Sequence, residues 1–196
     1  MLPEYFAFIS TVIASIGGAQ YLWLTFHGKV QPNRVTYFFW GLFPLIAFFA
    51  QSSTEVSSVI WITLAMGVLP FTILVASFLN TSAYWKINNR DYILAVIAIT
   101  SMFLWYLTSN PMLAIVFALL ADMFASIPTI IKCYTNPNSE DWRPYAINSV
   151  GFFVGVLAIQ TWSFPEYSFV LYFFLLTLLM AVLIYVRQIQ LKQVEN

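Results

Sequence analysis

Short polar breaks divide this chain into apolar runs that are each long enough to cross a lipid bilayer. A helix needs about 20 apolar residues to cross roughly 30 Å of hydrocarbon. Only 8% of the residues are charged and 61% are hydrophobic, whereas soluble domains carry about 25% charged residues. We therefore predict an all-α membrane protein with seven transmembrane helices, at residues 4–26, 34–51, 56–79, 91–108, 111–133, 144–161 and 166–187.

The basic residues are gathered on one side of the predicted membrane. With seven crossings, the loops after spans one, three and five share a side with the C-terminus, and all the basic residues lie there or at its edge: Lys29, Arg34, Lys86, Arg90, Lys132, Arg143, Arg187 and Lys192. The opposite side has Glu4, Glu55 and Glu166. The positive-inside rule then places the N-terminus outside and the C-terminus in the cytoplasm, in a plasma (inner) membrane. We interpret Lys132 and Arg143 as cytoplasmic anchors.

Several functional classes are disfavoured by composition. The net charge is zero, so nothing indicates nucleic-acid binding, and one cysteine with one histidine gives no basis for a metal site. We find no HExxH, GxSxG, P-loop or paired-carboxylate motif, so we predict neither an enzyme nor a cofactor. A retinal protein would need a lysine in the middle of span seven, and that span has no basic residue before Arg187.

The chain contains an internal repeat. When it is shifted by 109 residues, 19–51 aligns without a gap over 128–160, and three pairs are identical: Arg34 with Arg143, Phe43 with Phe152, and Gln51 with Gln160. The third helix of each copy is preceded by an S-x-x-E sequence, "SSTE" and "SFPE", which is typical of a capping box. The repeat predicts a three-helix bundle at 1–81, a linker helix at 82–109 and a second bundle at 110–196. An odd linker makes this 3+1+3 repeat parallel.

This arrangement resembles the SWEET and PQ-loop superfamily, which also includes the KDEL receptor and vitamin transporters. The family motif is a Pro-Gln pair near the end of the first helix of each repeat, then a polar loop, then an Asn in the next helix. The matching residues in the second copy are Pro128, Thr129 in place of Gln, Ser139-Glu140 and Asn148, and in the first copy Ala19-Gln20 after Gly17 and Gly18. The resemblance implies a SWEET-like fold and a carrier that works by alternating access.

Asp122 is a carboxyl group in the middle of span five, within "LLADMFASIPTIIK". A charged Asp at this depth costs about 2.5–3.5 kcal/mol on insertion scales, so it is expected to face the protein interior. Ser126 and Thr129 lie on the same helix face. Two interpretations are open. Asp122 either forms a packing hydrogen bond between helices or belongs to a solute or proton site, and the second is favoured because intramembrane carboxyl groups usually mark a pathway.

Flexible points occur at matching depths in the two copies. Pro128 has no N–H and leaves the carbonyl of Phe124 without its helical partner. Gly17 and Gly18 occupy the corresponding part of the first copy. We predict hinges at these positions, which suits a carrier that rocks between two states, although a static kink would explain the same residues.

A pocket is predicted between the second helices of the two copies. Trp40 offers an aromatic face and Asn148 offers an amide, which together suit a small polar solute. Tyr172 in span seven is a further candidate, together with Thr63, Thr72 and Thr177. The alternative is that Trp40 packs between helices and Asn148 bonds a neighbouring helix.

Together these features predict a transporter that moves a small polar solute, a sugar or similar metabolite, and that is linked to protons through Asp122. The alternative is a receptor or sorting protein of the same fold that binds a ligand without transporting it. The expected partners are the solute and the lipid bilayer, and homo-oligomerisation is left open.

Overall fold

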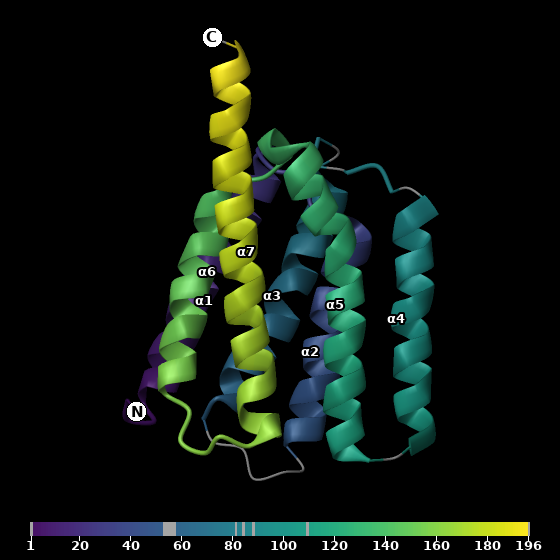
Figure 1. Cartoon of the computed structure of the whole chain (residues 1–196), viewed down its shortest axis with the longest axis vertical. Coiled ribbons are helices and arrows are strands. Elements are labelled where there is room, and N and C mark those ends of the chain that lie inside the picture. The colour runs from purple at the N-terminus through teal and green to yellow at the C-terminus, as the bar shows by residue number, and fades with distance from the viewer. Residues whose placement is uncertain are drawn as a thin grey trace.

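The computed structural model describes residues 2–52, 58–80, 82–83, 85–87, 89–108 and 110–195. Within these residues the chain is all-helical, with no strand, seven α-helices and one 3₁₀ turn (Figure 1). The α-helices are α1 (Phe6–Phe26), α2 (Arg34–Gln51), α3 (Ile60–Leu79), α4 (Asn89–Thr108), α5 (Pro111–Thr135), α6 (Trp142–Leu157) and α7 (Phe164–Glu195), and the turn η1 is Pro137–Ser139. The predicted helix order is therefore present.

Most helix bounds lie within a few residues of the predicted ones, and two differ more. α6 ends at Leu157, four residues before the predicted end, because the chain tightens there and the Ala158 N–H bonds to the carbonyl of Gly155. α7 continues to Glu195, eight residues beyond the prediction. Its extension, 188–195, contains three Gln, one Leu, one Lys and one Glu, which favour helix without needing lipid. The first residues predicted for span three, 56–57, lie outside the described residues.

Side-chain caps begin three of the helices. Asn33, Asn110 and Asp141 each accept backbone N–H groups from the first turn of α2, α5 and α6. Ser163 precedes α7, and its carbonyl accepts the N–H groups of Glu166 and Tyr167. The other predicted capping sequence, "SSTE", lies outside the described residues after Ser52. Local sequence thus fixes where these helices start.

The helices pack as a ring of six with one helix outside it. Following the main contacts, α1 packs on α3, α3 on α2, α2 on α5, α5 on α7, α7 on α6 and α6 on α1. α4 packs mainly on α5, with a smaller contact to α2, and stands at the edge of the bundle in Figure 1. The ring is closed by two contacts between the first three helices and the last three, α1 with α6 and α2 with α5.

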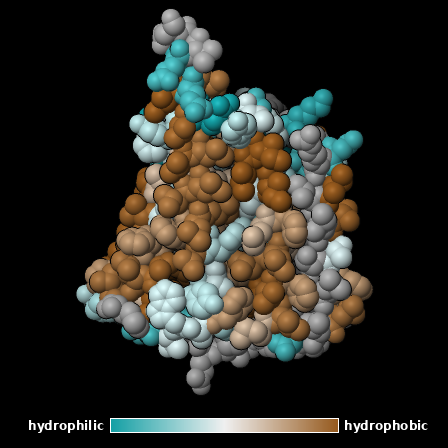
Figure 2. All heavy atoms as spheres, viewed as in Figure 1, coloured by the Kyte–Doolittle hydropathy of each residue, from teal (hydrophilic) through white to brown (hydrophobic). Residues whose placement is uncertain are grey.

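The outer surface is apolar along the length of the bundle. Large apolar side chains are exposed on each of the seven helices, including Phe8, Phe49, Val75, Phe103, Leu120, Val150 and Leu175. Figure 2 shows hydrophobic residues covering most of the visible side of the bundle, with hydrophilic residues mainly at the end that carries the C-terminus. Four of the described helices are long and apolar enough to cross a membrane: Phe6–Phe26, Ile60–Leu79, Met112–Thr135 and Phe164–Gln193. These are the features of a helical membrane protein.

The two termini lie at opposite ends of the bundle (Figure 1). We name these ends after the terminus found at each. The C-terminal end includes the connection 27–33 between α1 and α2 and the connection 136–141 between α5 and α6. The cavity and the Asp122 network described below lie between the two ends, and a second polar cluster lies at the C-terminal end.

Candidate functional site

Asp122 is fully buried in α5 and joins a hydrogen-bonded network across three helices. The Tyr172 hydroxyl of α7 donates to Asp122 Oδ2 at 2.7 Å and lies 3.1 Å from Ser126 Oγ. Ser126 Oγ in turn donates to the Asp122 backbone oxygen at 2.8 Å. From α2, Trp40 Nε1 donates to Ser126 Oγ at 2.7 Å. Four of the five residues predicted to bind solute, Trp40, Asp122, Ser126 and Tyr172, are therefore brought together.

The surroundings of the Asp122 carboxyl are uncharged. Among the described residues, no lysine or arginine pairs with it, and its second oxygen, Oδ1, has no hydrogen-bond partner. A buried polar atom without a partner is costly and needs an explanation beyond packing. The geometry leaves one carboxyl oxygen of Asp122 available to a further donor.

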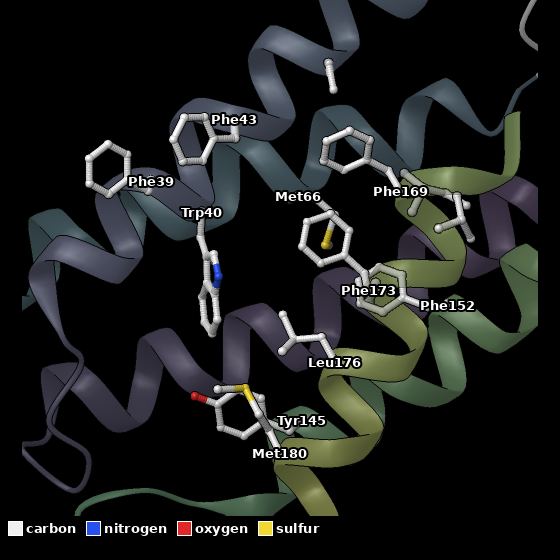
Figure 3. Close-up of a cluster of buried hydrophobic side chains, with 14 of the residues drawn as sticks. Phe39, Trp40, Phe43, Met66, Tyr145, Phe152, Phe169, Phe173, Leu176 and Met180 are labelled. Carbon is white, nitrogen blue, oxygen red and sulfur yellow. The ribbon is translucent and has the colours of Figure 1, made fainter. Parts of the chain in front are cut away.

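An internal cavity lies beside this network and between the two groups of three helices. Its volume is about 60 Å³, which is enough to hold water molecules. The wall includes Tyr21, Tyr37, Trp40, Met66, Pro70, Tyr145, Asn148, Phe152, Phe173, Leu176 and Thr177. Figure 3 shows the wall residues Trp40, Met66, Tyr145, Phe152, Phe173 and Leu176 gathered between the helices that carry them. Trp40 connects the two features, because its indole lines the cavity while its N–H bonds to Ser126.

Asn148 stands on the same cavity wall, where α6 meets α1. Its Oδ1 is buried and has no hydrogen-bond partner among the described residues. A Cβ atom added at Gly17 would collide with the Asn148 side chain and with the carbonyl oxygen of Pro144. Gly17 is therefore needed for the close approach of α1 to α6. Gly18 packs against Leu69 of α3 in the same way, and the hinge role of both glycines stays a prediction.

The residues of the predicted Pro-Gln-like motif point inward. Pro128 lies inside α5, Thr129 beside it is fully buried, and Gln20 is half-buried in α1. The Thr129 hydroxyl and Gln20 Oε1 have no hydrogen-bond partner in the part of the chain that the structure describes. The sequence interpretation passed over two further prolines inside helices, Pro44 in α2 and Pro70 in α3. Pro44 leaves the carbonyl of Trp40 without its helical donor.

The structure places the three threonine candidates in different surroundings. Thr177 lines the cavity and donates to the Phe173 carbonyl at 2.7 Å. Thr63 is buried, with an unpartnered hydroxyl among the described residues. Thr72 is exposed on the apolar outer surface, where it donates to the Leu69 carbonyl, so it faces away from the cavity.

A second buried polar cluster, at the C-terminal end, was missed by sequence reasoning. Glu140 pairs with Lys132 at 2.5 Å between Nζ and Oε1, and both side chains are almost completely buried. The Tyr21 hydroxyl donates to Glu140 Oε2 at 2.8 Å, and the Tyr145 hydroxyl lies 3.3 Å from the same atom. The predicted role of Lys132 as a cytoplasmic anchor does not fit its burial, because its side chain is 1% exposed and does not reach the surface. Arg143 is exposed, as expected of an anchor.

Part of this second cluster was visible in the sequence. The Ser139-Glu140 pair belongs to the polar loop of the repeat motif, and Lys132 precedes it at the end of an apolar run. The turn η1 lies between Lys132 and Glu140 in the chain and packs against α5 and α7.

No family model, curated protein or solved structure matches the chain.

Proposed function

We propose that this protein transports a small polar solute by alternating access. The observation that carries the proposal is the position of Trp40, which lines the cavity and is linked through Ser126 to Tyr172 and Asp122. The link joins the first three helices to the last three at the place where a solute would pass. A connected polar network inside a membrane protein commonly marks a substrate or proton path.

The proposal includes seven membrane crossings and a SWEET-like 3+1+3 parallel repeat. Support comes from the contacts between neighbouring helices in the ring of six. The same set of contacting pairs results when α1, α2 and α3 are exchanged with α5, α6 and α7, respectively. The pairs α1–α3 and α5–α7 correspond, as do α2–α3 and α6–α7, and α1–α6 maps onto α5–α2. A two-fold axis along the membrane normal produces this pattern. With α4 as the linker, the two repeats run in the same direction.

The chemistry of the cavity favours an uncharged solute such as a sugar. Its described wall combines aromatic faces with the Asn148 amide, and it contains no Asp, Glu, Lys or Arg. Aromatic faces pack on apolar surfaces while amides and hydroxyls satisfy polar ones. A cavity of about 60 Å³ is smaller than the roughly 300–1,000 Å³ of ligand pockets. Solute entry therefore requires the two groups of helices to separate, and the helix prolines and close-packed glycines are the points where we expect them to bend.

Asp122 is the group through which transport is linked to protons in this proposal. It has no cation partner among the described residues, and one of its oxygens lacks a donor. A carboxyl group in this setting exchanges a proton when water reaches it. Trp40 and Ser126 connect it to the cavity wall, so solute binding and proton occupancy can affect one another.

A binding and uptake screen on the purified protein tests the function. The probes are uncharged sugars, amino acids and vitamins, first as stabilisers of thermal unfolding and then as radiolabelled solutes in proteoliposomes. A ligand at 100 times its Kd raises the free energy of unfolding by about 2.7 kcal/mol. Asn148→Ala should abolish this gain. The control is Gln160→Ala, because Gln160 is an exposed amide bonded to the Leu2 carbonyl and is not part of the described cavity wall.

Two outcomes would contradict transport. Binding without uptake would favour the receptor alternative, and no binding by any probe would remove the basis for a solute site. The orientation is tested separately. A reporter after Asn196 should be cytoplasmic and a tag before Pro3 should be outside, and both ends on one side would refute seven crossings.

A further inference from the structure

Three tyrosines separate the cavity from the C-terminal end of the bundle. Tyr21, Tyr37 and Tyr145 line the cavity, and all three are buried. The Tyr21 ring stacks on Tyr37 with centroids 5.2 Å apart and meets Tyr145 edge-on at 5.8 Å. Tyr21 bonds to Glu140, which belongs to the connection 136–141 at the C-terminal end. The layer therefore lies between the cavity and this connection.

Behind the tyrosine layer, bonds cross from the first three helices to the last three. Tyr21 of α1 donates to Glu140, and Lys132 Nζ of α5 donates to the backbone oxygen of Gln31, in the connection between α1 and α2. The Gln31 N–H donates to the Ser139 oxygen at 3.0 Å. The Lys132–Glu140 pair itself lies within the last three helices and their connections. Separation of the two groups at this end would break these three bonds, together with the 3.4 Å contact between the Tyr37 and Tyr145 hydroxyls, and would leave the ion pair intact.

The burial of the Lys132–Glu140 ion pair disfavours a partly opened arrangement of the cluster. A buried ion pair is tolerated only when the remaining donors and acceptors are satisfied, because the desolvation of both charges is expensive. In this structure Tyr21 and Gln31 supply those partners from the other side. Without them, water must take their place. We therefore expect the cluster to be either closed and dry or open and hydrated, because an intermediate with unpartnered buried charges is unfavourable.

A polar depression lies at the loop surface beside the cluster. It has a volume of about 290 Å³, and its wall includes Gln31, Trp85, Asn136 and Ser139. Lys132 Nζ is 5.2 Å from the centre of the Trp85 ring and bonded to the Gln31 oxygen. Gln31 and Lys132 therefore connect the depression at the surface with Glu140 and the tyrosine layer below it.

We infer that Tyr21, Gln31, Lys132 and Glu140 form a latch that closes the cavity toward the C-terminal end. It opens when Tyr21 and Gln31 move away from Glu140 and Lys132, and the solute then leaves through the polar depression. This inference rests on the proposed function, because it assigns one of the two gates that alternating access requires. The inference adds to that function the route by which the solute leaves and the hydrogen bonds that must break.

A single reporter cysteine tests the latch without any solute. Cys133 is the only cysteine, so Cys133→Ala gives a background in which Thr177→Cys is placed in the cavity wall. A membrane-impermeant maleimide is applied to the C-terminal face or to the opposite face of the membrane. Tyr21→Phe should increase the labelling rate from the C-terminal face about tenfold, because a hydrogen bond to a charged carboxylate is lost. Labelling from the opposite face should not increase.

Tyr37→Phe is the matched control. Tyr37 is equally buried and lines the same cavity, but its hydroxyl has no bond to Glu140 and lies 3.4 Å from the Tyr145 hydroxyl. Tyr37→Phe removes the same atom from the same layer and loses only the 3.4 Å contact with Tyr145, while the bonds of Tyr21 to Glu140, Lys132 to Gln31 and Gln31 to Ser139 remain. Equal labelling rates for the two variants would overturn the inference. So would an increase for Tyr21→Phe that is the same from both faces.

A cross-link tests the latch in the other direction and does not depend on a weakened fold. Gln31 and Ser139 are joined through their backbones, so Gln31→Cys with Ser139→Cys, in the Cys133→Ala and Thr177→Cys background, allows a disulfide across the latch. Oxidation should reduce labelling of the cavity from the C-terminal face at least tenfold, and reduction should restore it. Unchanged labelling after complete cross-linking would overturn the inference. A latch that passes both tests in a protein that binds no solute would leave the gate standing and refute the proposed function.

Discussion

Two buried carboxyl groups in this protein have opposite surroundings. Glu140 faces Lys132 and accepts a hydrogen bond from Tyr21, so its charge has a cation and a donor. Asp122 accepts one hydrogen bond from Tyr172, and its other oxygen has no partner among the described residues. The Glu140 carboxylate is held as part of an ion pair. Asp122 has no charged partner among the described residues that would fix its charge state.

This difference separates a structural role from a chemical one. A buried carboxylate with its own cation gains little from exchanging a proton, because removal of either charge leaves the other unpaired. A buried carboxyl without a cation has a charge that depends on access to water and on nearby donors. We therefore expect Glu140 to control which parts of the protein hold together, and Asp122 to respond to solute and pH.

The largest effect is expected at the ion pair. Lys132→Met should lower the free energy of unfolding by about 3–5 kcal/mol, because it leaves Glu140 as an unpaired buried charge. The double variant Lys132→Met with Glu140→Gln should recover part of this loss. Denaturant unfolding of the purified protein in detergent measures both. A loss below about 1 kcal/mol would place this pair with weak surface ion pairs and remove the contrast with Asp122.

At Asp122 the two substitutions should separate stability from transport. Asp122→Asn should stay within about 1 kcal/mol of wild type in free energy of unfolding, since the amide has the same size and still accepts from Tyr172. It should abolish uptake or its pH dependence in proteoliposomes. Asp122→Leu should lower stability by about 1–3 kcal/mol, because Tyr172 loses its acceptor. Equal uptake and equal pH profiles for wild type and Asp122→Asn would make the carboxyl a packing group.

Trp40→Phe tests the link between the network and the cavity. The substitution keeps an aromatic ring on the cavity wall but removes the N–H that donates to Ser126. The expected loss of stability is about 0.5–1.5 kcal/mol, that of one hydrogen bond. If the link couples solute to Asp122, solute affinity should also lose its pH dependence. Retained pH dependence would show that Asp122 senses the solute by another route.

The smallest effect is expected at a third carboxylate, which is exposed and outside the helices. Glu4 accepts hydrogen bonds from the side chain and the backbone N–H of Ser58, and these lower the pKa of Glu4 below its ordinary value. The hydrogen bonds to Glu4 therefore stabilise the folded protein fully above the pKa that Glu4 has in the unfolded chain. This stabilisation is lost as pH falls through the lower pKa of Glu4 in the folded protein. Ser58→Ala should lower Tm slightly at neutral pH, and the difference should vanish in strong acid. A difference that persists there would contradict this assignment.

Sequence reasoning located the Asp122 network better than the Glu140 cluster, for physical reasons. Asp122 is conspicuous because it interrupts an apolar helix, and regular helical spacing places Ser126 on the same face. Tyr172 and Trp40 could be proposed as polar groups within neighbouring spans. Glu140 lies in a polar loop where charges are ordinary, and only the folding of that loop over α5 buries it beside Lys132. The spacing of residues along a helix predicts which side chains share a helix face. The conformation of a loop decides which of its charged side chains become buried.

The position of α4 outside the ring of six helices has a consequence for how the molecule is assembled. None of the described residues that line the cavity comes from α4, which is tied to the ring by its packing on α5 and by a hydrogen bond from Asn33 to Asp91. The ring is closed by the surfaces of α1 with α6 and of α2 with α5, without help from the linker. The connection of the two groups of helices along the chain and the closure of the ring therefore depend on different parts of the molecule. The linker determines how the second group of helices is threaded, and the matching surfaces determine where it docks.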